Sequence, residues 1–75
     1  MQNVLSLTDF IRSLAGRPLG FSAMWIVPDG KGYRDTTKIL TSTAGREGLK
    51  ISVSQALIVD PQALTTLEAV KVTVK

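Results

Sequence analysis

The spacing of apolar residues near the start of the chain is typical of a short amphipathic helix. In the segment SLTDFIRSLAG, residues 6–16, apolar side chains recur at i, i+3, i+4 and i+7, as Leu7, Phe10, Ile11 and Leu14. Ser6 is suited to cap the first turn, Asp9 is placed as in a capping box, and Gly16 suits the C-terminal end. We therefore predict a helix over residues 6–16.

After residue 20 the pattern changes from helical spacing to alternation of apolar and polar residues. Three segments alternate in this way and are predicted to be strands: residues 20–27, 49–59 and 67–75. PDGKG, residues 28–32, is a predicted turn, because proline fixes φ and glycine accepts positive φ. We therefore predict that YRDTTKIL, residues 33–40, returns as the second strand of a hairpin. Residues 41–48 then form a polar loop.

These elements predict a mainly β fold with one short N-terminal helix and a single small domain over residues 1–75. The expected architecture is a small antiparallel four- to five-stranded sheet or an OB-like barrel. Antiparallel pairing is favoured because parallel strands need long crossover connections. The chain is 44% hydrophobic and has no cysteine. This favours a homo-oligomer, which buries more surface per chain, over the simpler alternative of a self-sufficient monomer.

The composition carries little sign of catalysis or of metal binding. Histidine and cysteine are both absent, so the usual nitrogen and sulfur ligands of zinc are missing, and no metal or cofactor is expected. The six acidic residues form no recognisable pair, and no serine lies in a nucleophile-elbow motif. We therefore expect a protein that is not an enzyme. No run approaches the ~20 apolar residues of a membrane span, and the N-terminus lacks the basic start of a signal peptide, so we expect a cytoplasmic protein.

The basic residues are more informative than the acidic ones. The net charge is +3, and Lys31, Arg34 and Lys38 gather around the predicted hairpin with Tyr33 among them. Cations neutralise phosphates and release counterions, while an aromatic ring offers a stacking surface to an unpaired base. The same residues also fit a solvated strand face with Tyr33 packed at the sheet edge. Composition alone favours that second interpretation.

Several short motifs occur in a fixed order from residue 16 onward. They are GRP, an apolar strand ending at Val27, PDGKGY, TTKIL, a polar loop closing on Gly48, and the strands LKISVSQALIVD and VKVTV. In this order and spacing, residues 16–74 resemble the single-stranded-DNA-binding proteins of filamentous phages. The resemblance depends on the order of the motifs rather than on any one of them.

The resemblance implies a five-stranded antiparallel barrel related to the OB fold, a symmetric dimer, and sequence-independent coating of single strands. By position, Tyr33 matches a binding-wing aromatic residue and Lys38 a phosphate-contacting lysine. Arg17 matches the basic residue of the GRP start, and Lys71 a basic position of the last strand. The family begins with a strand where the pattern of residues 6–16 predicts a helix, so both structures stay open for that segment.

These observations predict a small, non-enzymatic, basic protein that binds single-stranded nucleic acid as a homodimer and is encoded by a phage or mobile element. The predicted nucleic-acid-binding residues lie in the hairpin and at two supporting positions: Lys31, Tyr33, Arg34, Lys38, Arg17 and Lys71. The alternative is a protein-binding regulator of the antirepressor or inhibitor type. Its contact surface would be the N-terminal helix, with Phe10 and Ile11, or an exposed strand edge. A third possibility is a subunit of a larger structural assembly.

Overall fold

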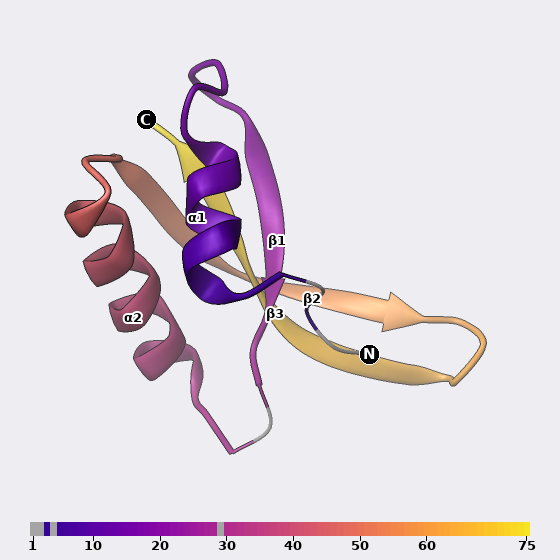
Figure 1. Cartoon of the computed structure of the whole chain (residues 1–75). Helices are drawn as coiled ribbons and strands as arrows, with labels where there is room; N and C mark the ends of the chain where they lie inside the picture. The colour runs from indigo at the N-terminus through magenta and orange to yellow at the C-terminus, as the bar shows by residue number, and fades with distance from the viewer. Residues whose placement is uncertain (1–2, 4, 29) are drawn as a thin grey trace.

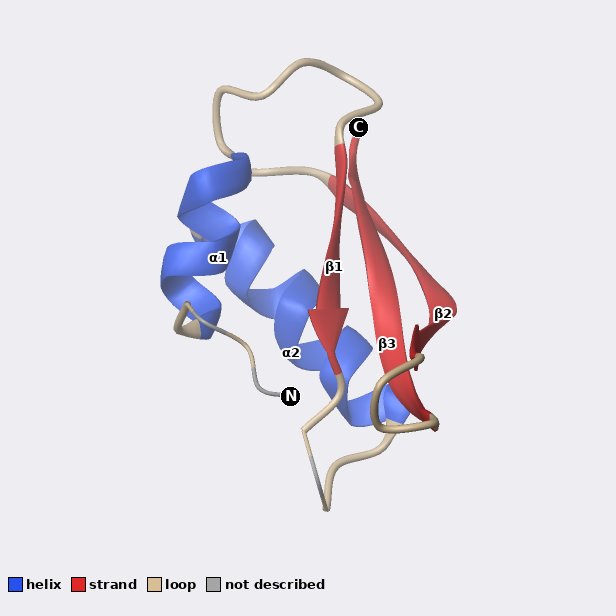
Figure 2. Ribbon diagram, turned by 90° about the vertical axis from the view of Figure 1, so that its right-hand side faces the viewer, coloured by secondary structure: helices blue, strands red, loops and turns tan. Residues whose placement is uncertain are grey.

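The structure, a computed structural model, describes residues 3, 5–28 and 30–75. The described residues form two helices and three strands in the order α1 (Leu7–Leu14), β1 (Ser22–Ile26), α2 (Tyr33–Arg46), β2 (Ile51–Asp60) and β3 (Thr65–Val74). Both helices lie on the same face of the sheet and leave its other face uncovered, which we call the open face (Figures 1 and 2).

The sheet is antiparallel throughout and has the strand order β1-β3-β2. The central strand is therefore β3, with Val70 opposite Trp25 of β1 and Val72 opposite Val53 of β2. The far ends of β2 and β3 extend together beyond the helices as a projecting hairpin (Figure 1). This topology leaves β1 and β2 as the two edge strands.

The predicted N-terminal helix is confirmed as α1. The Ser6 side chain caps it by accepting a hydrogen bond from the Asp9 amide at 3.2 Å. Phe10, Ile11 and Leu14 form its buried face, as their spacing predicts. Gly16 follows the helix with φ of +84°, a conformation in which glycine avoids the cost that a Cβ would bring.

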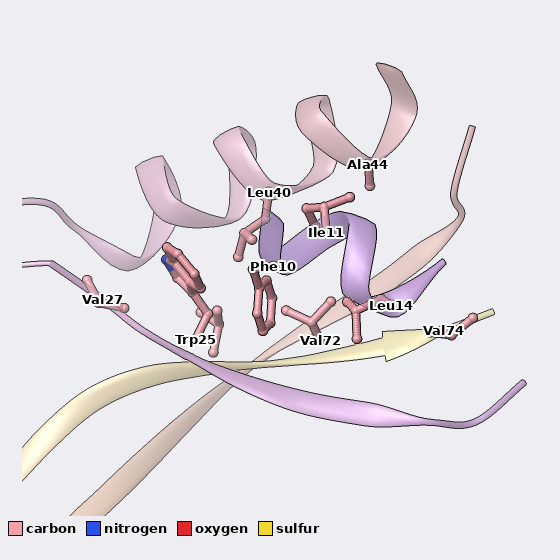
Figure 3. Packing of buried hydrophobic residues seen from close by; sticks show 10 residues of the cluster. Phe10, Ile11, Leu14, Trp25, Val27, Leu40, Ala44, Val72 and Val74 are labelled. Carbon is pink, nitrogen blue, oxygen red and sulfur yellow. The ribbon is translucent and has the colours of Figure 1, made fainter. Parts of the chain in front are cut away.

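The core lies between the helices and the covered face of the sheet (Figure 3). Alternate residues of β3, Val70, Val72 and Val74, point into it and are buried, as the period-two pattern predicts. Trp25 packs against Phe10 with ring centroids 4.8 Å apart and planes tilted by 48°. The strands predicted at residues 20–27, 49–59 and 67–75 are thus confirmed as β1, β2 and β3.

The strand predicted at residues 33–40 is wrong, because this segment begins the longer helix α2. Thr36, Leu40 and Ala44 recur at i, i+4 and i+8 and form the buried face of that helix. The threonines and the tyrosine favour strands only weakly, and burial of this helical face outweighs that preference. Most of the polar loop predicted at residues 41–48 belongs to the same helix.

The fold class is accordingly mixed α/β, with a second helix where a strand was expected. The described residues contain an open three-stranded sheet, not a sheet of four or five strands or an OB-like barrel. A barrel needs its first and last strands to pair with each other. Here β1 and β2 each pair only with β3, so the sheet does not close.

A Schellman motif centred on Gly48 ends α2. The Gly48 amide donates to the carbonyl oxygen of Gly45 at 3.2 Å, and the Leu49 amide donates to that of Ala44 at 2.8 Å. Gly48 has φ of +71°, as the C′ position of this motif requires. The motif turns the chain from the end of α2 into β2.

We expect Gly48→Ala to lower the free energy of unfolding by about 1 kcal/mol, because alanine is strained at positive φ. The matched control is Gly45→Ala inside α2, where an added Cβ meets no atom within 4 Å. That change should raise the free energy of unfolding by about 0.5 kcal/mol or more, since alanine favours a helix interior. Urea unfolding followed by circular dichroism measures both. If both substitutions changed the free energy of unfolding in the same direction, the role of Gly48 at the C-terminal end of α2 would be contradicted.

Candidate nucleic-acid interface

A stripe of basic and hydroxyl side chains runs along the solvent-facing side of α2. Arg34, Lys38, Ser42 and Arg46 recur every fourth residue and are all exposed. Each step along this stripe advances about 6 Å along the helix axis and turns slightly around it. We call these four residues the α2 stripe.

The acidic residues near α2 lie at its two ends. Asp35 is in the first turn, where a carboxylate interacts favourably with the helix dipole. Glu47 follows the last turn, and its Oε1 atom lies 3.3 Å from Nε of Arg12 on α1. Between Asp35 and Arg46 the helix carries no acid, and among the described residues neither Lys38 nor Arg46 forms an ion pair.

A shallow depression lies along the flank of α2 beside the stripe. Its lining residues come from three turns of the helix: Tyr33, Arg34, Thr37, Lys38, Thr41 and Ser42. Tyr33 supplies the aromatic ring and is only half-buried, because part of the ring packs against the core. The depression thus combines an aromatic surface, two cations and the hydroxyl groups of Thr41 and Ser42 on one rigid element, whereas the Thr37 Oγ1 is buried.

Only three of the six residues predicted from the sequence lie together, namely Tyr33, Arg34 and Lys38 at the start of α2. Lys31 precedes the helix and lines a separate small crevice with Trp25 and Thr36. The two cations expected to support the site lie elsewhere and are considered next.

Arg17 is engaged in local contacts at the loop between α1 and β1. Its guanidinium carbon lies 4.8 Å from the centroid of the Phe21 ring, and its Nε donates to the Ser13 carbonyl oxygen at 3.4 Å. Lys71 lies on the open face, because its neighbours Val70 and Val72 point into the core. The sheet therefore separates Lys71 from the α2 stripe.

Sequence reasoning missed Arg46 and the hydroxyl groups of Thr41 and Ser42. The available signal was the fourfold spacing of Arg34, Lys38, Ser42 and Arg46, which is meaningful only if residues 33–46 are helical. Once that segment was interpreted as a strand and a loop, these residues had no common face.

The apolar residues proposed for a protein-binding surface on the N-terminal helix are in the core. Ile11 is fully buried and Phe10 almost so; Phe10 points towards the sheet, and Ile11 lies on the side of α1 that faces Ala44 of α2 (Figure 3). Neither residue is available to a partner while the protein is folded. The second surface of that alternative, an exposed strand edge, is present in the structure as β2.

Comparisons with known proteins identify no relative: no protein-family model, curated protein or solved structure matches the chain. Over residues 3, 5–28 and 30–75, neither helix has the length and apolar character needed to cross a bilayer.

Proposed function

We propose that this protein is a non-enzymatic binder of single-stranded nucleic acid that contacts the phosphates through the α2 stripe. The observation that carries the proposal is the row of exposed cations on one face of a well-packed helix, Arg34, Lys38 and Arg46. The proposed contact surface is therefore on the helix α2, and not on the hairpin that the sequence predicted. Arg17 and Lys71 are not part of it.

The chemistry of the stripe suits the sugar–phosphate backbone. Guanidinium and ammonium groups neutralise phosphates and release condensed counterions, and threonine and serine hydroxyls donate hydrogen bonds to phosphate oxygens. Such contacts hold a strand without selecting its sequence. We therefore expect binding with little sequence preference.

The depression beside the stripe favours a single strand over a duplex. An unpaired base can stack on the exposed part of the Tyr33 ring while Arg34 and Lys38 hold the flanking phosphates. The bases of a duplex are stacked on one another and cannot enter this depression. Tyr33 is the only aromatic residue that lines it, so stacking contributes less than the phosphate contacts.

The expected affinity depends steeply on salt. Each phosphate contact on a single strand adds about −0.7 to the slope of log K against log salt concentration, so three cations give a slope of about −2. Raising the salt concentration about fourfold should then weaken binding by about tenfold or more.

The test compares two double variants that remove the same charge from different surfaces. In Arg34→Gln/Lys38→Gln the stripe loses two cations, and we expect the affinity for a fluorescent oligonucleotide of about 12 nucleotides to fall about tenfold or more. The salt slope should become shallower by about 1.4, about 0.7 for each cation that is removed. Fluorescence anisotropy at low and high salt measures both quantities.

The matched control is Lys71→Gln/Lys75→Gln, which removes two cations from β3 and the chain end. It lowers the net charge by the same amount, so any general effect of charge appears in both variants. Affinity close to that of the unmodified protein is expected for the control. Equal losses in the two variants, or no binding by the unmodified protein at low salt, would refute the α2 stripe as the interface.

A further inference from the structure

The two edges of the sheet differ in how their backbone groups are satisfied. On β1, the Asn3 side chain covers Ile26: its Nδ2 donates to the Ile26 carbonyl oxygen at 2.8 Å, and its Oδ1 accepts from the Ile26 amide at 2.9 Å. The carboxamide thus takes the place of a neighbouring strand at this position. In the described part of the chain, no comparable group covers the edge of β2.

The register shows which backbone groups of β2 are unpaired. The Lys75 amide donates to the Lys50 carbonyl oxygen at 3.0 Å, so the even-numbered residues of this strand pair with β3. The odd-numbered residues direct their N–H and C=O groups away from the sheet: Ile51, Val53, Gln55, Leu57 and Val59. The structure shows no hydrogen bond to these groups among the described residues.

The sequence of β2 also lacks the features that usually protect an edge strand. Between Lys50 and Asp60 it contains no charged residue, no proline and no glycine. Leu57 and Val59 are 64% and 68% exposed, although they lie on the same side of the strand as the core residues. A long edge strand without charged residues, proline or glycine is a template for pairing with another strand.

We propose that β2 pairs with β2 of a second copy of this chain, antiparallel and around a two-fold axis at Gln55. In this register Ile51 lies opposite the partner's Val59, and Val53 lies opposite the partner's Leu57. Every outward N–H and C=O from Ile51 to Val59 then has a partner. The two three-stranded sheets become one continuous six-stranded sheet.

The opposite charges at the two ends of β2, Lys50 and Asp60, favour a second copy of the chain as the partner and fix the register of the pairing. In the same alignment Lys50 lies opposite Asp60 of the partner subunit, and the pair occurs twice because the interface is symmetric. The Asp60 Oδ1 accepts from the amides of Gln62 and Ala63 at 3.0 and 3.3 Å, which holds the carboxylate at the strand end. Any shift of register separates these charges and leaves part of the edge unpaired.

The exposed apolar side chains of the projecting hairpin also gain neighbours in this arrangement. Leu57 and Val59 would lie beside the partner's Val53 and the partner's Ile51, which are only half-buried in the single chain. Cross-strand apolar pairs of this kind stabilise a sheet. The arrangement accounts for apolar residues that the helices of their own chain leave uncovered.

Pairing at β2 also sets the positions of the two α2 helices. A two-fold axis perpendicular to the joined sheet keeps both helical layers on the same face, and α2 packs against β2, the strand that would lie next to that axis. The dimer therefore presents both α2 stripes on one face. The use of this arrangement in nucleic-acid binding rests on the proposed function. The dimer itself is inferred from β2 alone and does not depend on that function.

Sedimentation equilibrium of the protein without nucleic acid tests the dimer. We expect a mass of about 16 kDa, twice the 8.1 kDa of one chain. In Gln55→Pro the dimer should dissociate, with a dissociation constant at least tenfold higher, because proline removes an outward N–H at the axis. The hydrogen bonds to β3 stay, since Gln55 lies opposite Val70 in a pair whose backbone groups do not hydrogen-bond to each other.

The control is Ser22→Pro, which places proline at an outward-facing position of the other edge strand, β1, and should leave the dimer intact.

A second variant tests the dimer in case Gln55→Pro fails to fold. Lys50→Glu places two acids opposite each other at both ends of the interface and should also raise the dissociation constant, whereas Lys71→Glu on the central strand should not. A monomeric unmodified protein, or dimers that persist in both Gln55→Pro and Lys50→Glu, would overturn the proposal.

Discussion

Replacing Leu40 with alanine is expected to lower the free energy of unfolding by about 3 kcal/mol. Leu40 is fully buried at the middle of α2, where it packs between α1 and the sheet (Figure 3). The substitution removes buried methyl groups and leaves a cavity that the surrounding side chains fill only in part. For a domain of this size, the loss should lower the melting temperature by more than about 10 °C.

The matched control for this prediction is Leu64→Ala. Leu64 is 89% exposed in the turn between β2 and β3, so the same chemical change removes almost no buried surface. Its effect on the free energy of unfolding should stay within about 0.5 kcal/mol. Thermal unfolding followed by circular dichroism compares the two. Similar melting temperatures for both variants would show that α2 does not pack on the sheet through Leu40.

Replacing Thr36 with valine is expected to stabilise the protein by about 1 kcal/mol or more. Thr36 is only 4% exposed on the buried face of α2. Its Oγ1 has no hydrogen-bond partner among the described residues. Valine has nearly the same shape, so it fills the same space without the unpaired hydroxyl. Valine and threonine also have similar helix propensities, so the backbone contributes little to the difference.

Thr41→Val is the control for Thr36→Val, because Thr41 is an exposed residue of the same helix. Because this residue is exposed, its replacement should change the free energy of unfolding by less than about 0.5 kcal/mol. Urea unfolding measures both variants. A loss of stability in Thr36→Val would mean that the buried hydroxyl has a partner that stabilises the fold.

The parts of the fold that were predictable from the sequence have strong periodic patterns. Leu7, Phe10, Ile11 and Leu14 repeat at helical spacing next to a serine cap, and the valines of residues 67–75 alternate with polar residues. In both cases the local pattern and the burial in the folded protein agree. These two patterns were therefore sufficient to predict the helix α1 and the strand β3.

The segment of residues 33–46 was not predictable by the same reasoning. Its tyrosine and threonines favour a strand, and its buried face consists of small or weakly apolar residues, Thr36 and Ala44 around Leu40. A face of this kind gives little periodic signal, and only packing against α1 and the sheet makes it helical. Gly48 was expected to close a polar loop, and it proved to be the C′ residue that follows α2.

The candidate site was predictable as a set of residue types but not as a surface. The grouping of Tyr33, Arg34 and Lys38 is present in the structure, although on a helix. The addition of Lys71 relied on the order of motifs in a resemblance to a barrel. Because the sheet is open and β3 is its central strand, Lys71 faces away from α2.

The most direct test of the proposed interface is a titration of the ¹⁵N-labelled protein with a single-stranded oligonucleotide, followed by amide chemical shifts in NMR spectra. We predict that the largest shifts occur along the exposed side of α2, from Arg34 to Arg46, and that they weaken as salt is raised. Shifts concentrated on the open face, around Met24 and Lys71, would contradict the account, as would spectra that do not change at low salt.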